Sequence, residues 1–278
     1  MSKALALLAH DLRLLRHTTE YEFRKVLAFR VGFVVRELLN GVAHPAVMIC
    51  LYFALYAQAS SEAIGGWSFP EIVGYMILSA CVQKMLFHHR LLEVADQIFT
   101  GHLTKFLVMP FRFFTLPLGR FVQNTLLQVA IATLCYFAGL YLVPDWWPRP
   151  ASPSAAAQAF ALVLLGSACF LLAYYCLAIL AFWLDVVWSL SVMFMFVANF
   201  ISGRMIPVSQ MPPIFEAIFR WTFPYWALSA PIELFMGRTP EGFFLEGLSV
   251  LLPTLLVLEL LRRVLWRLGR RRYVGAGM

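Results

Sequence analysis

Charged residues are scarce in this chain of 278 residues. Lys, Arg, Asp and Glu together make up 13% of it, whereas hydrophobic residues make up 61%. A soluble domain is usually about one quarter charged, because charged side chains cover its surface. The composition therefore excludes an ordinary water-soluble protein and predicts a chain that lies mostly within a membrane.

Motifs for catalysis and for metal binding are also missing. The five cysteines stand singly within apolar runs, so they favour neither a disulfide framework nor a zinc site and predict small packing residues. The sequence has no P-loop of the form G-x-x-x-x-G-K-[ST], no H-E-x-x-H and no G-x-S-x-G. We therefore expect no catalytic residue, no cofactor and no metal in this chain.

One alternative for a metal site involves His88, His89 and Glu93, since His89 and Glu93 are one helical turn apart. These residues flank a predicted membrane boundary, where titratable side chains are usually only solvated. The metal alternative is therefore the less favoured of the two.

Six apolar runs are present instead, each close to the roughly 20 residues that a helix needs to cross about 30 Å of hydrocarbon. They predict membrane-spanning helices at about 38–57, 69–89, 116–143, 157–183, 187–203 and 245–262. A proton-coupled transporter generally has an ionisable residue in mid-membrane. None of the six runs has one near its centre, so an ion-driven carrier is disfavoured. The expected fold class is all-α, as a single polytopic domain over 1–278.

Basic residues are distributed asymmetrically between the loops. Eighteen of the 22 Lys and Arg residues lie in the segment up to Arg36, in the loop from Lys84 to Arg120 and in the tail from Arg262. Lys and Arg are enriched in cytoplasmic loops. Both termini and the loop 90–115 are thus expected inside, with 262–278 as a basic cytoplasmic tail. Because the excess of positive charge is explained by the predicted cytoplasmic segments, it does not predict nucleic-acid binding.

The leading segment, 1–36, predicts an amphipathic helix. Leu5, Leu8, Leu12 and Leu15 recur at steps of three and four residues, which suits a helix lying in the headgroup plane. An ordinary cytoplasmic helix packed on protein is the alternative.

The inner loop also contains a short amphipathic pattern. Its apolar residues from Leu91 to Phe99 share one helix face, and Gly101 is a plausible helix terminator. Pro110 prevents the following turns from continuing as a helix into the next span. The apolar face must meet lipid or a partner.

The segment from Ile201 to Pro231 interrupts the apolar pattern. It contains Arg204, Glu216, Arg220 and five prolines, which exclude one continuous helix. The charge distribution places this segment outside.

The order of these features, together with five motifs, resembles the membrane subunit (permease) of an ABC-2 type exporter, in particular the uncharacterised bacterial permeases of that class. The motifs are Glu20–Arg24 before the first span, Thr100–Pro110, the pair Phe182 and Trp183, Ser202–Pro207 and Phe223–Arg238. The resemblance covers nearly the whole chain. Lys105 and Met109 depart from the residues common in relatives.

The resemblance implies two functional regions. The inner loop would couple to a cytoplasmic ABC ATPase through Asp96, Ile98, Phe99, Gly101, Leu103 and Lys105. The segment 204–238 would re-enter the outer leaflet as two short helices and form an outer gate, with Gly203, Arg204, Pro207, Pro224, Tyr225 and Pro231 as its key residues. ATP and Mg²⁺ would bind the partner ATPase, and a second permease, the same or homologous, would complete the path in a bacterial inner membrane.

The expected function is export of an amphipathic or apolar substrate from the cytoplasm or the inner leaflet. Two alternatives stay open. A membrane-embedded enzyme that modifies lipid or glycan would need polar residues converging at one depth, and none is found by sequence. A scaffold or assembly subunit would not transport at all.

Overall fold

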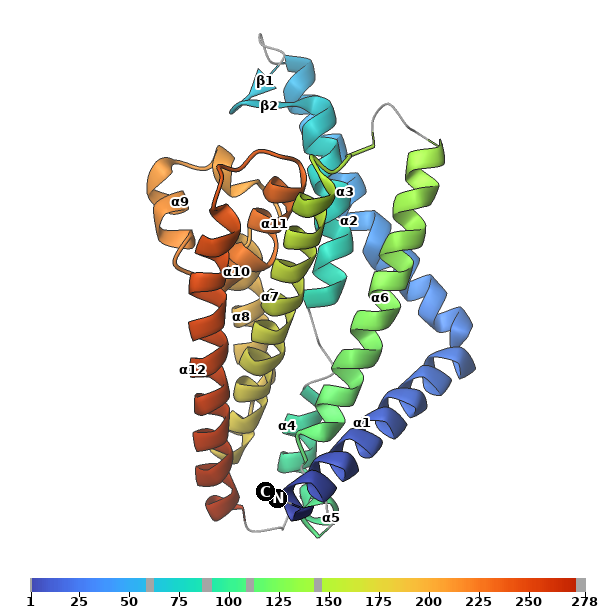
Figure 1. The fold of residues 1–278 in the computed structure, drawn as a ribbon, viewed down its shortest axis with the longest axis vertical. Coiled ribbons are helices and arrows are strands. Elements are labelled where there is room, and N and C mark those ends of the chain that lie inside the picture. Colours follow the sequence, from blue (N-terminus) through green and yellow to red (C-terminus); the bar gives the residue numbers. More distant parts are fainter. Residues whose placement is uncertain (1, 59–62, 87–91, 109–112, 143–146, 274–278) are drawn as a thin grey trace.

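The structure is a computed structural model that describes residues 2–58, 63–86, 92–108, 113–142 and 147–273. These residues are almost entirely helical (Figure 1). The long helices are α1 (Ser2–Ala28), α2 (Arg30–Gln58), α3 (Phe69–Leu86), α6 (Thr115–Leu142), α7 (Pro153–Ile179), α8 (Trp188–Ile201) and α12 (Phe243–Arg272). The shorter elements are α4 (Leu92–Phe99), α5 (Leu103–Leu107), η2 (Leu180–Phe182), η3 (Val208–Gln210), α9 (Pro213–Phe219), α10 (Phe223–Ala227) and α11 (Ser229–Phe235).

A helix lies at each of the six predicted spans, so the sequence located the helices correctly. Within the described residues, α6, α7 with η2, and α12 are long and apolar enough to cross a membrane. The apolar part of α2, Pro45–Gln58, and helix α8 are shorter. The membrane-embedded, all-α class is therefore supported, while the six crossings stay a prediction.

Two differences from the sequence-based expectation have clear causes. Strands β1 (Ala63–Ile64) and β2 (Trp67–Ser68) form a small antiparallel ribbon in a predicted loop, because Gly65 and Gly66 adopt positive φ and permit a tight turn. Helix α12 continues to Arg272, well beyond the predicted end of the last span. Nothing in that basic segment stops the helix, and cations are favourable near its C-terminus.

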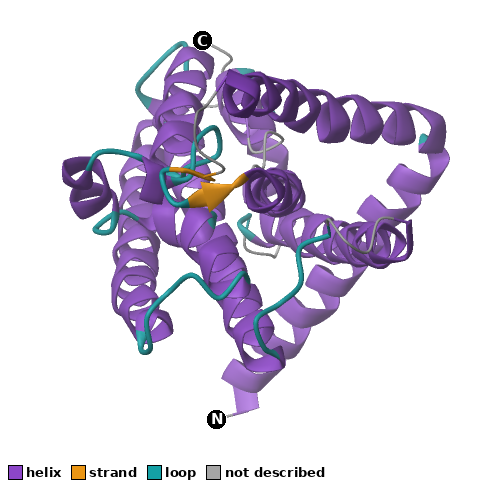
Figure 2. Cartoon of the chain, turned by 90° about the horizontal axis from the view of Figure 1, so that it is seen from above, coloured by secondary structure: helices purple, strands orange, loops and turns teal. Residues whose placement is uncertain are grey.

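Helices α1 and α2 meet at an angle at one edge of the molecule (Figures 1 and 2). Of the predicted helix in 1–36, residues 2–28 form α1, and α1 packs along α6. The Thr19 hydroxyl donates to the Gly119 carbonyl over 3.3 Å, and a Cβ at Gly119 would lie 2.7 Å from the side chain of Thr18. This part of α1 is therefore packed on protein, and its position at a membrane surface stays a prediction.

Helix α7 is the centre of the bundle. It contacts α12, α11, α10, α3 and α4, and most of its apolar length is buried within the chain, unlike that of α6 or α12. Its start is well specified: the Ser152 side chain accepts a hydrogen bond from the Ala155 amide over 3.0 Å, and Pro153 occupies the first turn. Because α7 has no charged residue, it can be covered on all sides.

Candidate functional site

The structure has two candidate sites, one at each end of α7. The first, which we call the inner platform, comprises residues 92–108 and contains α4 and α5. The second, the outer hairpin, comprises residues 204–238 and contains η3, α9, α10 and α11. Figure 1 shows them at opposite ends of the bundle.

The inner platform is built on the end of α7. Val94, Ala95 and Ile98 are buried where α4 meets α7 and η2. Gly101 has a φ of +75°, so it ends α4 as the sequence predicted and turns the chain into α5. Leu103 follows with no exposed surface. The platform is thus a fixed part of the bundle.

Tyr273, just after α12, fastens the turn between α4 and α5. Its hydroxyl donates to the Gly101 carbonyl over 2.7 Å and accepts from the Thr104 amide over 3.1 Å. Its ring also meets Phe182 edge-on, with ring centres 6.0 Å apart. The sequence analysis missed Tyr273; its only signal is one aromatic residue directly after a basic helix.

Aromatic rings connect the platform with α12. Phe106 contacts Phe113, whose ring stacks on Trp266 of α12 at 5.3 Å and 7°. Trp266 in turn meets Phe182 of η2 at 5.8 Å. Phe182 leaves no space for a side chain at Gly269, because a Cβ there would lie 2.1 Å from the Phe182 ring. The Phe-Trp motif therefore begins with a residue that joins η2, α12 and the platform.

An ionic bridge, also missed by sequence, connects the platform with α1 and α6. Arg120 of α6 donates to Glu22 of α1 over 2.9 Å and to Glu93 of α4 over 2.5 Å. Glu22 belongs to the Glu20–Arg24 motif and is almost fully buried. Glu93 and Arg120 lie close to predicted span ends and Glu22 lies in the leading segment, but their separation in sequence concealed the pairing.

The structure divides the predicted coupling residues into two groups. Ile98 is 4% exposed, because α4 packs against α7 and η2 of the same chain, and Leu103 of α5 is 0% exposed. Phe99 is 38% exposed, and Asp96 and Lys105 are also exposed. Direct docking through Ile98 and Leu103 is therefore not possible in this arrangement. The exposed apolar residues Leu107 and Val108 accompany Phe99. Both belong to the motif Thr100–Pro110, but neither was among the predicted coupling contacts.

A buried polar cluster fastens the outer hairpin to α3. Gly203 has a φ of +75°, and its carbonyl accepts a 2.7 Å hydrogen bond from the hydroxyl of Tyr75. The same hydroxyl lies 3.1 Å from Ser229 Oγ. A Cβ at Gly203 would lie 2.8 Å from Val208 and 3.1 Å from the Tyr75 hydroxyl. Glycine is thus required here both for conformation and for space.

Glu233 of α11 is the acidic centre of this cluster. It is 6% exposed and accepts hydrogen bonds from Ser209 over 3.1 Å and from Ser229 over 3.2 Å. Trp67 of β2 donates its indole N–H to Ser209 Oγ over 3.2 Å. The cluster thereby joins α11 and η3 to α3 and to the β1–β2 ribbon.

Arg238 makes a second attachment at the end of the hairpin. Its guanidinium donates to Glu71 of α3 and to the Gly66 carbonyl, both over 2.6 Å, and lies over the Trp67 ring at 4.0 Å. In the sequence analysis Arg238 is the last residue of the motif Phe223–Arg238, with no role of its own. Its partners lie 167 and 172 residues away, beyond the reach of sequence pattern.

The tip of the outer hairpin packs against the middle of α7. A Cβ at Gly166 would lie 2.6 Å from the Ala227 Cα, so the two backbones are in close contact. Gly166 is 13 residues after Pro153, or about 20 Å along a helix with a rise of 1.5 Å per residue. Pro224, Tyr225 and Pro231 are all buried in this region. The hairpin thus re-enters the bundle, as four short pieces and not the two predicted.

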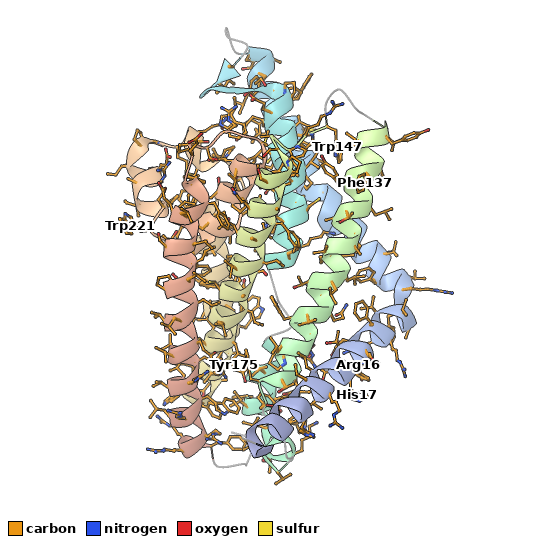
Figure 3. The ribbon with its side chains drawn as sticks, viewed as in Figure 1. Arg16, His17, Phe137, Trp147, Tyr175 and Trp221 are labelled. Atoms are coloured by element: carbon orange, nitrogen blue, oxygen red, sulfur yellow. The ribbon has the colours of Figure 1, made fainter. Side chains whose placement is uncertain are left out.

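The prolines begin the short helices more than they break a long one. Pro213 and Pro224 lie in the first turns of α9 and α10, and Pro207 directly precedes η3. Arg204 is half-buried near this break, and burial lowers the pKa of its guanidinium to about 10. Trp221 extends away from the bundle after α9 and is 82% exposed (Figure 3). Such an aromatic suits a membrane interface.

No group of His, Cys, Asp and Glu within the described residues could hold a metal ion. Of the alternative metal cluster, His88 and His89 lie outside the described residues, as do Met109 and Pro110 of the motif Thr100–Pro110.

Comparison with known proteins adds one finding. The model of a family described as ABC-2 family transporter protein matches residues 42–277, which is most of the chain. No curated protein gives a significant match. The matched range includes both the inner platform and the outer hairpin.

Proposed function

The chain belongs to the ABC-2 family of transporter proteins, and on that premise we propose that it is the permease of an ATP-driven exporter. Its substrate would be amphipathic or apolar and would leave from the cytoplasm or the inner leaflet. Membrane subunits of this family transport and do not catalyse, and they generally work with a cytoplasmic ATPase. In this proposal ATP and Mg²⁺ bind that partner, and a second permease, the same or homologous, completes the path.

The inner platform is the proposed docking site for the ATPase. Phe99 would be the central apolar contact, with Asp96 and Lys105 at the rim and Leu107 and Val108 beside it. Interfaces often concentrate their energy in a few apolar or aromatic residues. The buried Ile98 and Leu103 would hold the platform in place without touching the partner.

Helix α7 offers a direct connection between the two sites. It packs on α4, as does η2, which continues its C-terminal end, and it packs on α10 at Gly166 and on α11. A displacement of the platform by the ATPase would therefore act on the same rigid element that supports the outer hairpin. We propose that ATP binding shifts the population between closed and open hairpin states in this way.

The membrane orientation in this proposal has both termini in the cytoplasm of a bacterial cell. The 18 basic residues at the predicted inner positions support it. The outer hairpin then lies at the exit. Gly203, Pro207, Pro224 and Pro231 are buried there, and α10 and most of α11 are covered by protein, whereas α9 is largely exposed. Irregular backbone at membrane depth is tolerated when protein covers it.

The observation that carries the proposal is the inner platform itself: a small amphipathic element, locked to α7 and α12, that exposes an aromatic side chain away from the bundle. Its test is co-purification of the full chain with a candidate ABC ATPase from the same organism. Phe99→Asp should weaken the complex by about thirtyfold, because loss of a central contact costs about 2 kcal/mol and 1.4 kcal/mol is a factor of ten.

Phe99→Leu is the matched control, since it keeps an apolar side chain at the same position and should retain the complex. Normal complex formation and normal substrate-stimulated ATP hydrolysis in Phe99→Asp would contradict docking at this platform. A complex that never shows stimulated hydrolysis with any apolar or amphipathic compound would favour the scaffold alternative. Conversion of a lipid or glycan by the purified chain alone would favour the enzyme.

A further inference from the structure

A large cavity lies between the helices, and the proposed transport cycle assigns no ligand to it. Its volume is about 1060 Å³, and its walls come from α1, α5, α6, α7 and α12. Ligand pockets commonly measure about 300–1,000 Å³, so this one has room for a large molecule. Tyr175, labelled in Figure 3, belongs to the α7 wall.

The α12 wall changes from apolar to basic along its length. Leu252, Leu255 and Leu256 line the cavity at one end, and Arg263, Arg267 and Arg270 line it at the other. The three arginines are spaced four and three residues apart, so they share one helix face. Along α12, the cavity wall therefore has an apolar part followed by a cationic part.

The length of this pattern matches one leaflet of a membrane. Leu252 and Arg263 are 11 residues apart, which is about 16 Å along a helix. Half of a hydrocarbon core of about 30 Å is about 15 Å. An acyl chain packed along the leucines would place its headgroup beside the arginines. The apolar residues Leu12 and Leu256, which also line the cavity, are 56% and 61% exposed.

Two of the arginines have cationic charge available for a ligand. Glu259 accepts from Arg262 over 2.7 Å and from Arg263 over 2.6 Å, so one carboxylate serves both. Arg267 and Arg270 form no ion pair within the part of the chain that the structure describes. Asp11 of α1 is the other carboxylate on the cavity wall, so four arginines face two acids. The cavity therefore favours an anion.

We infer that this cavity binds an anionic phospholipid of the inner leaflet, with its phosphate held by Arg267 and Arg270 and its acyl chains on the leucine wall. Basic pockets between transmembrane helices on the cytoplasmic side are known to suit anionic lipid headgroups, and guanidinium groups match phosphate geometry. The inference rests on the proposed orientation of the chain, but not on transport or on an ATPase. The bound lipid would also touch Phe106 and Leu107 of the inner platform, which line the same cavity.

Native mass spectrometry of the full-length chain in detergent can test this inference. The probes are phosphatidylglycerol and phosphatidylcholine with identical acyl chains, titrated separately. The wild type should bind phosphatidylglycerol at least tenfold more tightly. The double variant Arg267→Gln/Arg270→Gln should lose about thirtyfold of that affinity, since each arginine near an anionic lipid contributes about 1 kcal/mol and 1.4 kcal/mol is a factor of ten.

The matched control is Arg271→Gln/Arg272→Gln. It removes the same charge from the same helix end, but neither residue lines the cavity, and the affinity should change little. For the acyl chains, Leu256→Trp fills the cavity and should weaken both lipids, whereas Leu261→Trp lies outside the lining residues and should not. The headgroup alone, as glycerol phosphate, should fail to displace the lipid.

Equal binding of the two lipids would overturn the inference. So would an equal loss in both arginine pairs, which would indicate general attraction to a basic tail. Displacement by glycerol phosphate would show a site for a soluble anion instead. A failure of the proposed orientation is detected separately, by labelling Arg267→Cys from the outside, and a failure of transport by absent ATPase stimulation.

Discussion

The hydroxyl of Tyr75 is expected to hold the outer hairpin against α3, so Tyr75→Phe should make the hairpin open more often. The ring of Tyr75 is fully buried and meets Trp67 edge-on at 5.5 Å, and phenylalanine preserves that packing. What is lost is the 2.7 Å hydrogen bond to the Gly203 carbonyl and the contact with Ser229.

The free-energy cost of Tyr75→Phe follows from the burial of the Gly203 carbonyl, which loses its hydrogen-bond donor. Gly203 is buried, and a buried acceptor that loses its donor costs about 1–3 kcal/mol. When the hairpin opens, water can satisfy that carbonyl, so the cost applies to the closed state only. A central value of about 2 kcal/mol raises the open fraction about thirtyfold, at a factor of ten per 1.4 kcal/mol.

Cysteine labelling at Val208 can measure this fraction. Val208 lies in η3, packs against Gly203 and has no exposed surface, so Val208→Cys should react only when the hairpin opens. A membrane-impermeant maleimide is added from the outside, and modification is counted at this position by mass spectrometry to separate it from the five native cysteines. If opening is fast relative to labelling, the rate reports the open fraction.

Tyr56→Phe is the matched control. The Tyr56 hydroxyl also donates to a backbone carbonyl, that of Trp67 at 2.6 Å, but within the described residues it forms no hydrogen bond with the hairpin. Its loss should leave the labelling of position 208 nearly unchanged. If Tyr75→Phe labels at the wild-type rate, or if both variants accelerate equally, the cluster around Tyr75 does not hold the hairpin closed.

Two further predictions concern topology and the inner platform. Single cysteines at Gln97 and Arg271 should be labelled from the cytoplasmic side, and those at Pro150 and Met211 from the outside; labelling of position 211 only from the cytoplasm would contradict the six-span arrangement. Tyr273→Phe removes the hydroxyl that bonds Gly101 and Thr104, which should loosen the platform by about 1–2 kcal/mol and speed tryptic cleavage after Lys105 roughly tenfold. Tyr141→Phe, at an exposed position, is the control, and equal cleavage in both variants would show that Tyr273 does not clamp the platform.

Much of the architecture could be predicted because its signals are local. Apolar runs of about twenty residues predicted where the long helices lie. A glycine at position 101 predicted the end of α4, and its φ in the structure is positive. The prolines between Ile201 and Pro231 predicted an interrupted segment for an equally local reason. The structure places Pro213 and Pro224 in the first turns of α9 and α10, where a missing amide hydrogen is tolerated. The resemblance in motif order was then confirmed by the family match.

The roles of individual side chains required the tertiary structure. Helical periodicity placed Ile98 and Phe99 on one apolar face, but it could not say that α7 and η2 cover the first and leave the second exposed. The bridge from Arg120 to Glu22 spans 98 residues of sequence, and no local pattern selects one charged partner among several.

Composition alone determined that this chain enters a membrane, because transfer from water to hydrocarbon depends on residue type and length. The distribution of Lys and Arg predicts which loops lie on each side. The tertiary structure decided how far the outer hairpin enters the bundle and what holds it there. Gly166 lets Ala227 approach the middle of α7, and Tyr75, Ser229 and Glu233 meet only when α3 and α11 lie side by side. Close contacts and buried hydrogen bonds depend on distances between segments remote in sequence, and only the packed fold fixes those distances.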